Sequence, residues 1–185
     1  MQTENTLEKP ITEIEDYKIL VYDLHSSALA TDAMGLLSQD AVFNYDDAAN
    51  IWGELNPALF DLQQKIISLS QVYQSKFVQD SEREIESFDG WYVSTATSNT
   101  HLQKHHHRGH SDINCLYYVY ADMQDPGPIE IYLETDENSA PHEEHYLFKP
   151  FPGALIFFPG ASPHRVRPYE RLRLTVATNI KLKSK

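Results

Sequence analysis

After Glu84 the sequence changes from a helical to a strand periodicity, and this change constrains the fold more than any other feature. Short runs rich in aromatic and β-branched residues follow one another at residues 90–98, 114–120, 129–134, 145–148, 154–158 and 171–178. Turn-forming segments such as Asp125–Pro128 and Pro159-Gly160 lie between these runs. A series of short strands separated by such turns predicts a β-sandwich or a β-barrel.

The first half of the chain contains the predicted helices. Apolar residues recur at helical spacing between about Pro57 and Asp80, and Pro57 suits the first turn of a helix. Residues 17–24 are typical of a strand, and residues 26–39 of a short helix. We therefore expect one α+β domain over residues 1–185. Its jelly-roll core, a cupin-like double-stranded β-helix over residues 86–181, would be closed by the last strand. Residues 16–85 would be mainly helical support, and residues 1–15 flexible.

Composition and charge narrow the class of partner. Hydrophobic residues make up 41% and charged residues 23% of the 185 residues, as in ordinary soluble globular proteins. The formal net charge of −12 argues against binding to nucleic acid or to anionic membranes, which both require a basic face. No apolar run reaches the roughly 18–20 residues of a membrane helix. Cys115, the only cysteine, cannot form an internal disulfide, so we expect a cytoplasmic protein. The oligomeric state is left open.

Five histidines lie within ten residues, from His101 to His110, directly before the second strand run. A His-x-His or His-x-Asp pair can supply two metal ligands from one extended segment, because alternate side chains point the same way. The loop contains both forms, as His105 with His107 and as His110 with Asp112. A solvated histidine cluster with no dedicated metal would share this composition.

A second segment adds a third candidate ligand and an arginine. Gly153–Pro159 is typical of a buried strand and turn that would bring His164 to the mouth of the barrel. Arg173 follows nine residues later, and strand alternation puts it on one face with Thr175, Ala177 and Asn179. A guanidinium fork beside a hydroxyl group suits a buried dicarboxylate, although Arg173 could instead form a surface ion pair in this acidic chain. The combination favours a non-haem iron centre with an arginine that binds a carboxylate.

At these residues the chain resembles the 2-oxoglutarate/Fe(II)-dependent oxygenase superfamily, in particular the prolyl hydroxylases and small oxygenases of bacteria and phages. The similarity covers about Trp91 to Asn179 and rests on His105–His107, Asn114–Tyr118, Gly153–Pro159, His164–Val166 and Arg173–Thr175. It implies an oxidoreductase, a dioxygenase with Fe(II) as cofactor and 2-oxoglutarate as cosubstrate. Such an enzyme decarboxylates 2-oxoglutarate to succinate and commonly hydroxylates a second substrate.

The resemblance also implies the roles of individual residues. His105, His107 and His164 would bind the metal, and Arg173, Thr175 and Tyr118 would hold the distal carboxylate of 2-oxoglutarate, with no further catalytic residue. Prolyl hydroxylases carry aspartate where His107 stands, so this assignment implies a site of three histidines. The pair His110 and Asp112 is the alternative that would restore the usual triad. A set of His105, Asp112 and His164 is also sterically conceivable.

Cupins offer a rival interpretation, because they share the jelly roll. Their pattern of His-x-His, four residues and an acid matches His105, His107 and Asp112, and their Gly-x5-Pro-x4-His pattern matches Gly153, Pro159 and His164. This resemblance implies a metal-binding protein, or a three-histidine dioxygenase or isomerase, that does not use 2-oxoglutarate. Arg173 with Thr175 favours the oxygenase, because 2-oxoglutarate enzymes need such a pair and cupins generally do not.

The substrate class is less constrained. The chain has no spare recognition domain, so we expect a small molecule or a peptide side chain as substrate. The loop 122–128 and the acidic segment 134–144 are the candidates for a lid. The acidic segment contains five carboxylates, which would favour a positively charged substrate, although a solvated loop is the simpler interpretation.

Overall fold

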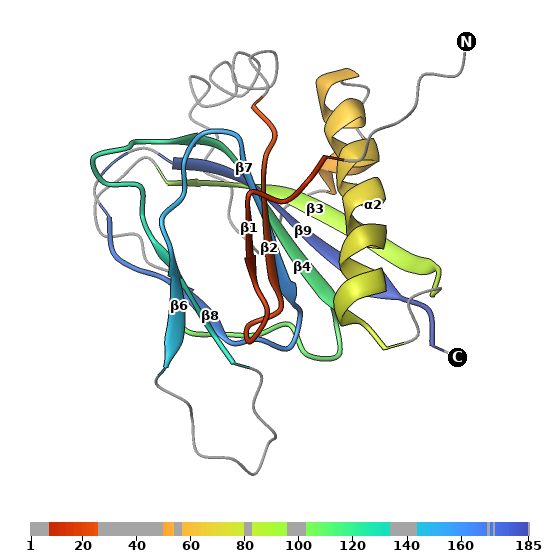
Figure 1. The fold of residues 1–185 in the computed structure, drawn as a ribbon. Helices are drawn as coiled ribbons and strands as arrows, with labels where there is room; N and C mark the ends of the chain where they lie inside the picture. The colour runs from red at the N-terminus through yellow and green to blue at the C-terminus, as the bar shows by residue number, and fades with distance from the viewer. Residues whose placement is uncertain are drawn as a thin grey trace.

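The computed structural model describes residues 8–25, 50–53, 57–79, 83–95, 103–133, 144–169, 171 and 173–184. Within them, an α-helix, a short 3-10 helix and nine strands form an α+β fold with two antiparallel sheets (Figure 1). The strands are β1 (Thr12–Ile14), β2 (Ile19–Asp23), β3 (Ile85–Thr95), β4 (Ile113–Ala121), β5 (Ile129–Tyr132), β6 (His145–Phe148), β7 (Ala154–Pro159), β8 (His164–Val166) and β9 (Arg173–Leu182). The helices are η2 (Ile51–Gly53) and α2 (Pro57–Phe77). The predicted helix at residues 26–39 lies outside the described residues.

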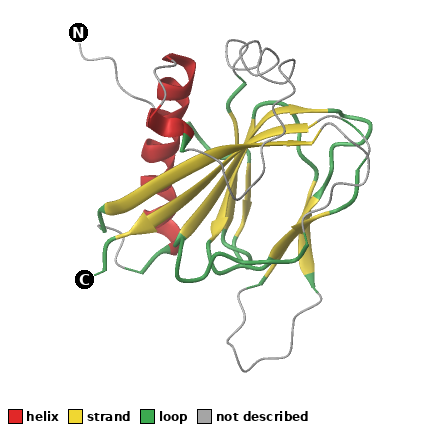
Figure 2. Cartoon of the chain, turned by 180° about the vertical axis from the view of Figure 1, so that it is seen from behind, coloured by secondary structure: helices red, strands yellow, loops and turns green. Residues whose placement is uncertain are grey.

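The two sheets have the arrangement of a jelly roll. The large sheet has the order β1-β2-β7-β4-β9-β3 and the small sheet the order β6-β5-β8. Seen from behind, the strands of the large sheet run beside α2, and the small sheet lies on the other side of the molecule (Figure 2). The predicted α+β fold with a jelly-roll core is therefore confirmed.

Two apolar clusters lie on opposite faces of the large sheet. The first joins α2 to the sheet: Leu59, Ile66 and Tyr73 from the helix pack with Cys115, Phe157 and other buried strand residues. The second lies between the sheets and includes Tyr118, Ile131 and Phe158. The helical spacing of the apolar residues of α2 thus lets the helix cover one face of the large sheet. The other face is left for the small sheet and for a cavity between the two sheets. Among the described helices, none is long and apolar enough to cross a membrane.

Three features differ from the sequence-based expectation. Residues 12–14, expected to be flexible, form β1 and pair with β2, which itself pairs with β7 of the large sheet. The last strand does not close the barrel at an edge, because β9 lies between β4 and β3. β8 was not predicted, since three residues are too few to show an alternating pattern.

Candidate metal centre

Two histidines far apart in the sequence are joined by their backbones. His105 and His164 form an isolated antiparallel bridge, with hydrogen bonds of 3.0 Å from His105 N to His164 O and 2.8 Å from His164 N to His105 O. The segment that contains His105 is thereby attached to β8, the edge strand of the small sheet. Directly paired residues point their side chains to the same face, so the two imidazoles lie side by side with ring centroids 4.3 Å apart.

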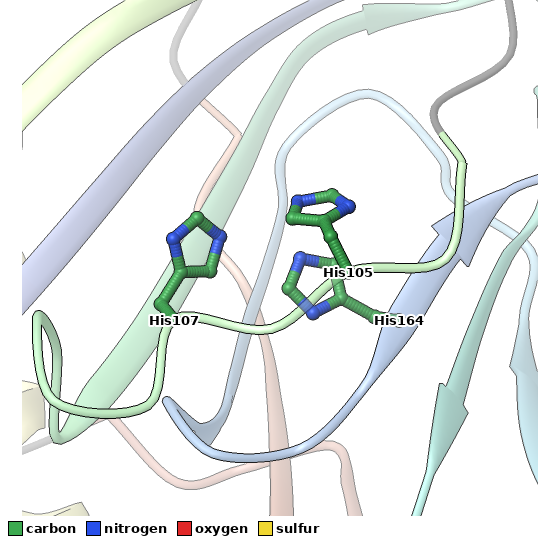
Figure 3. Close-up of side chains that lie close together, drawn as sticks. All are labelled: His105, His107 and His164. Carbon is green, nitrogen blue, oxygen red and sulfur yellow. The ribbon is translucent and has the colours of Figure 1, made fainter.

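His107 belongs to the same group. It lies two residues after His105, and alternate residues of an extended segment point their side chains to the same face. The backbone N–H of His107 donates to Gly160 O at 2.9 Å, which attaches the loop to the turn after β7. Gly160 is required here, since a Cβ at this position would lie 2.1 Å from Ser111 O. One ring nitrogen from each of His105, His107 and His164 can be chosen so that all lie within 4.8 Å of one another (Figure 3).

Hydrogen bonds fix the tautomer of two of the rings. His105 Nδ1 lies 2.8 Å from Gln103 O, and His164 Nδ1 lies 3.0 Å from Ser162 O. A carbonyl oxygen only accepts, so Nδ1 carries the proton in both rings and Nε2 keeps a free lone pair. Burial lowers the pKa of His164 to about 3 and that of His107 to about 4, with a further contribution from neighbouring histidines. Both rings are therefore neutral at physiological pH, the form that binds metals.

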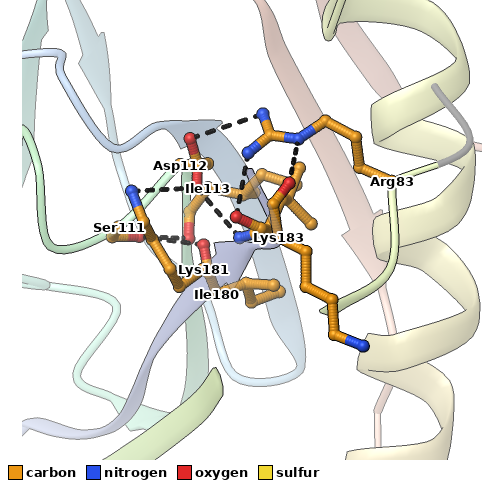
Figure 4. Close-up of polar contacts among 8 residues, drawn as sticks. Arg83, Ser111, Asp112, Ile113, Ile180, Lys181 and Lys183 are labelled. Atoms are coloured by element: carbon orange, nitrogen blue, oxygen red, sulfur yellow. Dashed lines mark hydrogen bonds and ion pairs between the residues drawn. The ribbon is translucent and has the colours of Figure 1, made fainter. Parts of the chain in front are cut away.

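The alternative pair lies elsewhere. The chain turns back after His107, whose carbonyl accepts from the N–H groups of His110 and Ser111 at 2.9 Å each. His110 is exposed. Asp112 points toward basic residues at the far end of β9, where its Oδ2 lies 2.9 Å from Leu182 N and 3.3 Å from Lys181 Nζ (Figure 4). Asp112 Oδ1 also lies 3.8 Å from Arg83 Nη1, so this carboxylate has a structural role away from the histidine cluster.

The cavity next to the histidines extends along β9 to a buried arginine. Arg173 and Thr175 line the same cavity as the three histidines, on the face that strand alternation predicted. Arg173 is 3% exposed and donates from Nη1 to Gly127 O at 2.9 Å, and no carboxylate forms an ion pair with it within the described ranges. Arg173 Nε and Thr175 Oγ1 are buried without a hydrogen-bond partner.

Tyr118 lies beside this arginine. It is the cross-strand partner of Thr175, and its ring centroid lies 5.7 Å from Arg173 Cζ. Its hydroxyl group is buried without a partner, and burial raises its pKa to about 12, so it is a protonated donor. A buried cation beside two unused donors is costly unless an anion binds there.

Solved structures share this architecture. A prolyl-4-hydroxylase from Pseudomonas putida aligns over 95% of this chain and 98% of its own, with a TM-score of 0.67 and 14% sequence identity. A prolyl hydroxylase complex with a peptide of the hypoxia-inducible factor, from Trichoplax adhaerens, aligns over 90% of this chain and 84% of its own, with a TM-score of 0.63 and 15% identity. The α-ketoglutarate-dependent epimerase SnoN of nogalamycin biosynthesis aligns over 90% of this chain and 78% of its own, with a TM-score of 0.64 and 8% identity.

This chain has the fold of the 2-oxoglutarate/Fe(II)-dependent oxygenases. No protein-family model matches the sequence, and no curated protein matches it. The likeness is therefore one of structure, in keeping with the resemblance that the sequence motifs indicated.

Two asparagines in the cavity were given no role from the sequence. Asn114 and Asn179 are cross-strand partners on β4 and β9, and both line the cavity. Asn179 Nδ2 lies 3.4 Å from His107 Nδ1, and the buried amide of Asn114 has no partner at either Nδ2 or Oδ1. Strand alternation already placed Asn179 on the same face of the strand as Arg173, so the sequence could have indicated that Asn179 lines the cavity. Nothing in the local sequence indicated a contact with His107.

Of the two candidate lids, the loop 122–128 is held by hydrogen bonds and an ion pair with three arginines, one of which is the buried Arg173. Its Gly127 carbonyl binds Arg173, its Pro128 carbonyl accepts from Arg167 N at 2.9 Å, and Asp122 pairs with Arg171 at 3.3 Å. A left-handed φ of 64° at Gly127 and close packing on Tyr169 exclude a larger residue there. The acidic segment lies outside the described residues except for Glu144, which is exposed.

Proposed function

We propose that this protein is an Fe(II)- and 2-oxoglutarate-dependent dioxygenase in which His105, His107 and His164 bind the metal. The observation that carries the proposal is Arg173, which is buried in the same cavity as the three histidines and has no carboxylate partner among the described residues. A histidine cluster alone would suit many metals and reactions. A cavity that combines a metal site with a buried cation that forms no ion pair within the described ranges calls for a ligand that binds metal and also carries a distant carboxylate.

The residues at both ends of the cavity fit this ligand. At one end, three imidazoles offer nitrogen ligands that suit iron and would leave coordination positions free for other ligands. At the other end, Arg173 and Thr175 line the cavity and Tyr118 lies beside them, so the three side chains offer donors for a carboxylate. No Asp or Glu lines this cavity among the described residues. When bound, Fe(II) would supply oxygen activation, by which dioxygen converts 2-oxoglutarate to succinate and CO2 and its second oxygen atom hydroxylates the substrate.

The protein itself contributes binding and exclusion of water. Arg173 would orient 2-oxoglutarate by a charge-assisted hydrogen bond to its distal carboxylate, and the hydroxyl groups of Thr175 and Tyr118 would complete its hydrogen bonds. Apolar side chains such as Leu116, Ile129 and Phe158 line the space between the two ends and keep it dry. A dry cavity strengthens each of these polar contacts.

Anaerobic titration of the protein with Fe(II) and then 2-oxoglutarate tests the proposal. We expect the weak visible charge-transfer band of an iron–2-oxoglutarate complex. Arg173→Gln should weaken 2-oxoglutarate binding by about 10- to 100-fold, which is the loss of affinity expected when a charge-assisted hydrogen bond is removed. Arg171→Gln is the matched control, because Arg171 lies two residues away but is 51% exposed and pairs with Asp122. Equal loss in both variants would contradict the role of Arg173.

One observation favours a second candidate function. The cluster contains His107 in place of a carboxylate, which would suit a cupin-type three-histidine dioxygenase that does not use 2-oxoglutarate. The same titration separates the two functions. Tight metal binding with no 2-oxoglutarate band would replace the first proposal with the second.

For the substrate, we propose a small molecule or a peptide side chain, preferably one with a positive charge. The structure from Trichoplax adhaerens contains a peptide, which supports a peptide as one option. The acidic composition of residues 134–144 supports a cationic group. Succinate release should be screened with amino acids, basic metabolites and short peptides. Equal stimulation by acidic compounds would rule out the charge preference.

A further inference from the structure

The three histidines differ in what holds their second ring nitrogen. His105 and His164 each face a backbone carbonyl within their own segment. His107 instead faces the side-chain amide of Asn179, which comes from β9. The orientation of His107 therefore depends on a side chain that mutation can remove.

The side-chain amide of Asn179 can present either its NH2 group or its oxygen to His107. Only the oxygen is compatible with a metal at Nε2 of His107. If the NH2 group of Asn179 faces His107 Nδ1, this nitrogen must accept, and the neutral ring carries its proton on Nε2, where it blocks the metal. If the amide is rotated by half a turn, its oxygen accepts from Nδ1–H, and Nε2 keeps its lone pair. The two orientations have almost the same shape, so the hydrogen-bonding partner decides between them.

We propose that Asn179 is a positioning residue for His107, whose side-chain oxygen accepts the Nδ1 proton and so directs Nε2 to the metal. The inference rests on the proposed metal site. It gives β9 two tasks, because the inward face that carries Arg173 at one end carries Asn179 at the other. It also makes the three histidines equivalent, each with Nδ1–H bound to a carbonyl oxygen.

The opposite strand offers a matched comparison. Asn114 is the cross-strand partner of Asn179 and lines the same cavity, but it forms no hydrogen bond with a histidine within the described ranges. Asn114→Ala removes an amide from the cavity and leaves the acceptor of His107 in place. Asn179→Asp keeps an acceptor oxygen at the position of the amide, whereas Asn179→Ala removes it.

The experiment is a titration of the full chain and these variants with Co(II), followed by its visible absorption. Asn179→Ala should lower the affinity by about 10- to 100-fold, as is usual for loss of a partner of a metal-binding histidine. Asn179→Asp should bind as tightly as the unmodified protein or more tightly, and Asn114→Ala should stay within about threefold of it. Unchanged affinity in Asn179→Ala, or equal losses in Asn179→Ala and Asn114→Ala, would overturn the proposal.

Nitrogen-15 NMR of the metal-free protein gives a second readout that does not depend on metal or on a folded variant. The ring of His107 should carry its proton on Nδ1, as should the rings of His105 and His164. A proton on Nε2 of His107 would overturn the role of Asn179 even if the protein binds cobalt. Absence of cobalt binding by the unmodified chain, with Nδ1–H on His107, would instead count against the proposed metal site alone.

Discussion

At the scale of single residues, the candidate site differs from its surroundings in charge. Burial keeps His107 and His164 neutral by lowering their pKa values, and the carboxylate nearest to the histidines in sequence, Asp112, is bound to basic residues and to a backbone N–H. A metal at this site would keep its full double positive charge, which favours anionic ligands such as 2-oxoglutarate. Arg173 at the far end of the cavity would favour the other carboxylate of the proposed cosubstrate. The site would therefore suit a dianionic ligand that has one carboxylate at each end.

The identity of the ligands can be tested by substitution. His164→Ala should weaken Co(II) binding by more than about 100-fold, because a lost ligand costs more than a lost hydrogen-bond partner. Asp112→Asn should leave the affinity unchanged, since this carboxylate lies outside the cluster. Isothermal titration of both proteins measures the difference. A comparable loss in Asp112→Asn would return the choice of ligands to the pair His110 and Asp112.

At the scale of elements, the small sheet is held by a buried charge on its outer face. Glu130 of β5 is fully buried, and it accepts hydrogen bonds from Tyr132 Oη at 2.6 Å and from the side chains of Arg165 and Arg167. Arg165 is its cross-strand partner on β8, the strand that presents His164 on the opposite face. Although burial alone would raise the pKa of Glu130, the hydrogen bonds from Arg165, Tyr132 and Arg167 lower it to about 2.

This carboxylate should make stability depend on pH in the acid range. The pKa of Glu130 is lower in the folded protein than its ordinary value of 4.5, so its contribution is complete above about pH 4.5 and is lost as the pH falls toward 2. Glu130→Gln should remove this part of the dependence and lower stability at neutral pH, because Arg165 and Arg167 lose their anion. Urea unfolding at several pH values measures the effect. Glu84→Gln is the control, since that carboxylate is exposed, and an equal effect there would contradict the prediction.

At the scale of the whole molecule, the large sheet separates the structural core from the site. α2 packs on one face, and the cavity lies on the other, between the two sheets. Ile66→Ala should cost about 2–5 kcal/mol of stability, because Ile66 is fully buried in the cluster under α2. The affinity of the folded protein for Co(II) should not change. Phe60→Ala, at a position 59% exposed, is the control for stability, and a large loss of affinity in Ile66→Ala would show that the two faces are coupled.

The sequence predicted the elements that have enough residues to show a period. The helix α2 and the strand β4 were predicted close to their bounds, whereas β9 ends at Leu182, four residues beyond its expected end. Alternation along β9 correctly grouped Arg173 with Thr175. β1 and β8 have three residues each and show no period, so they were not predicted as strands. Strand alternation could not show which histidine pair lies beside His164. A turn after His107 redirects the chain, and the bridge to His164 is a long-range contact.

The bridge between His105 and His164 also bears on the order in which the protein is made. His105 and His107, two of the three proposed ligands, leave the ribosome first, and the strands β4 to β7 must still be synthesised before β8 brings His164. β9 follows later still and brings Arg173. Contacts of such long range form late in folding, because the intervening chain must first be ordered. A metal held by all three histidines, as proposed, would therefore bind only after β8 has paired with the segment that contains His105.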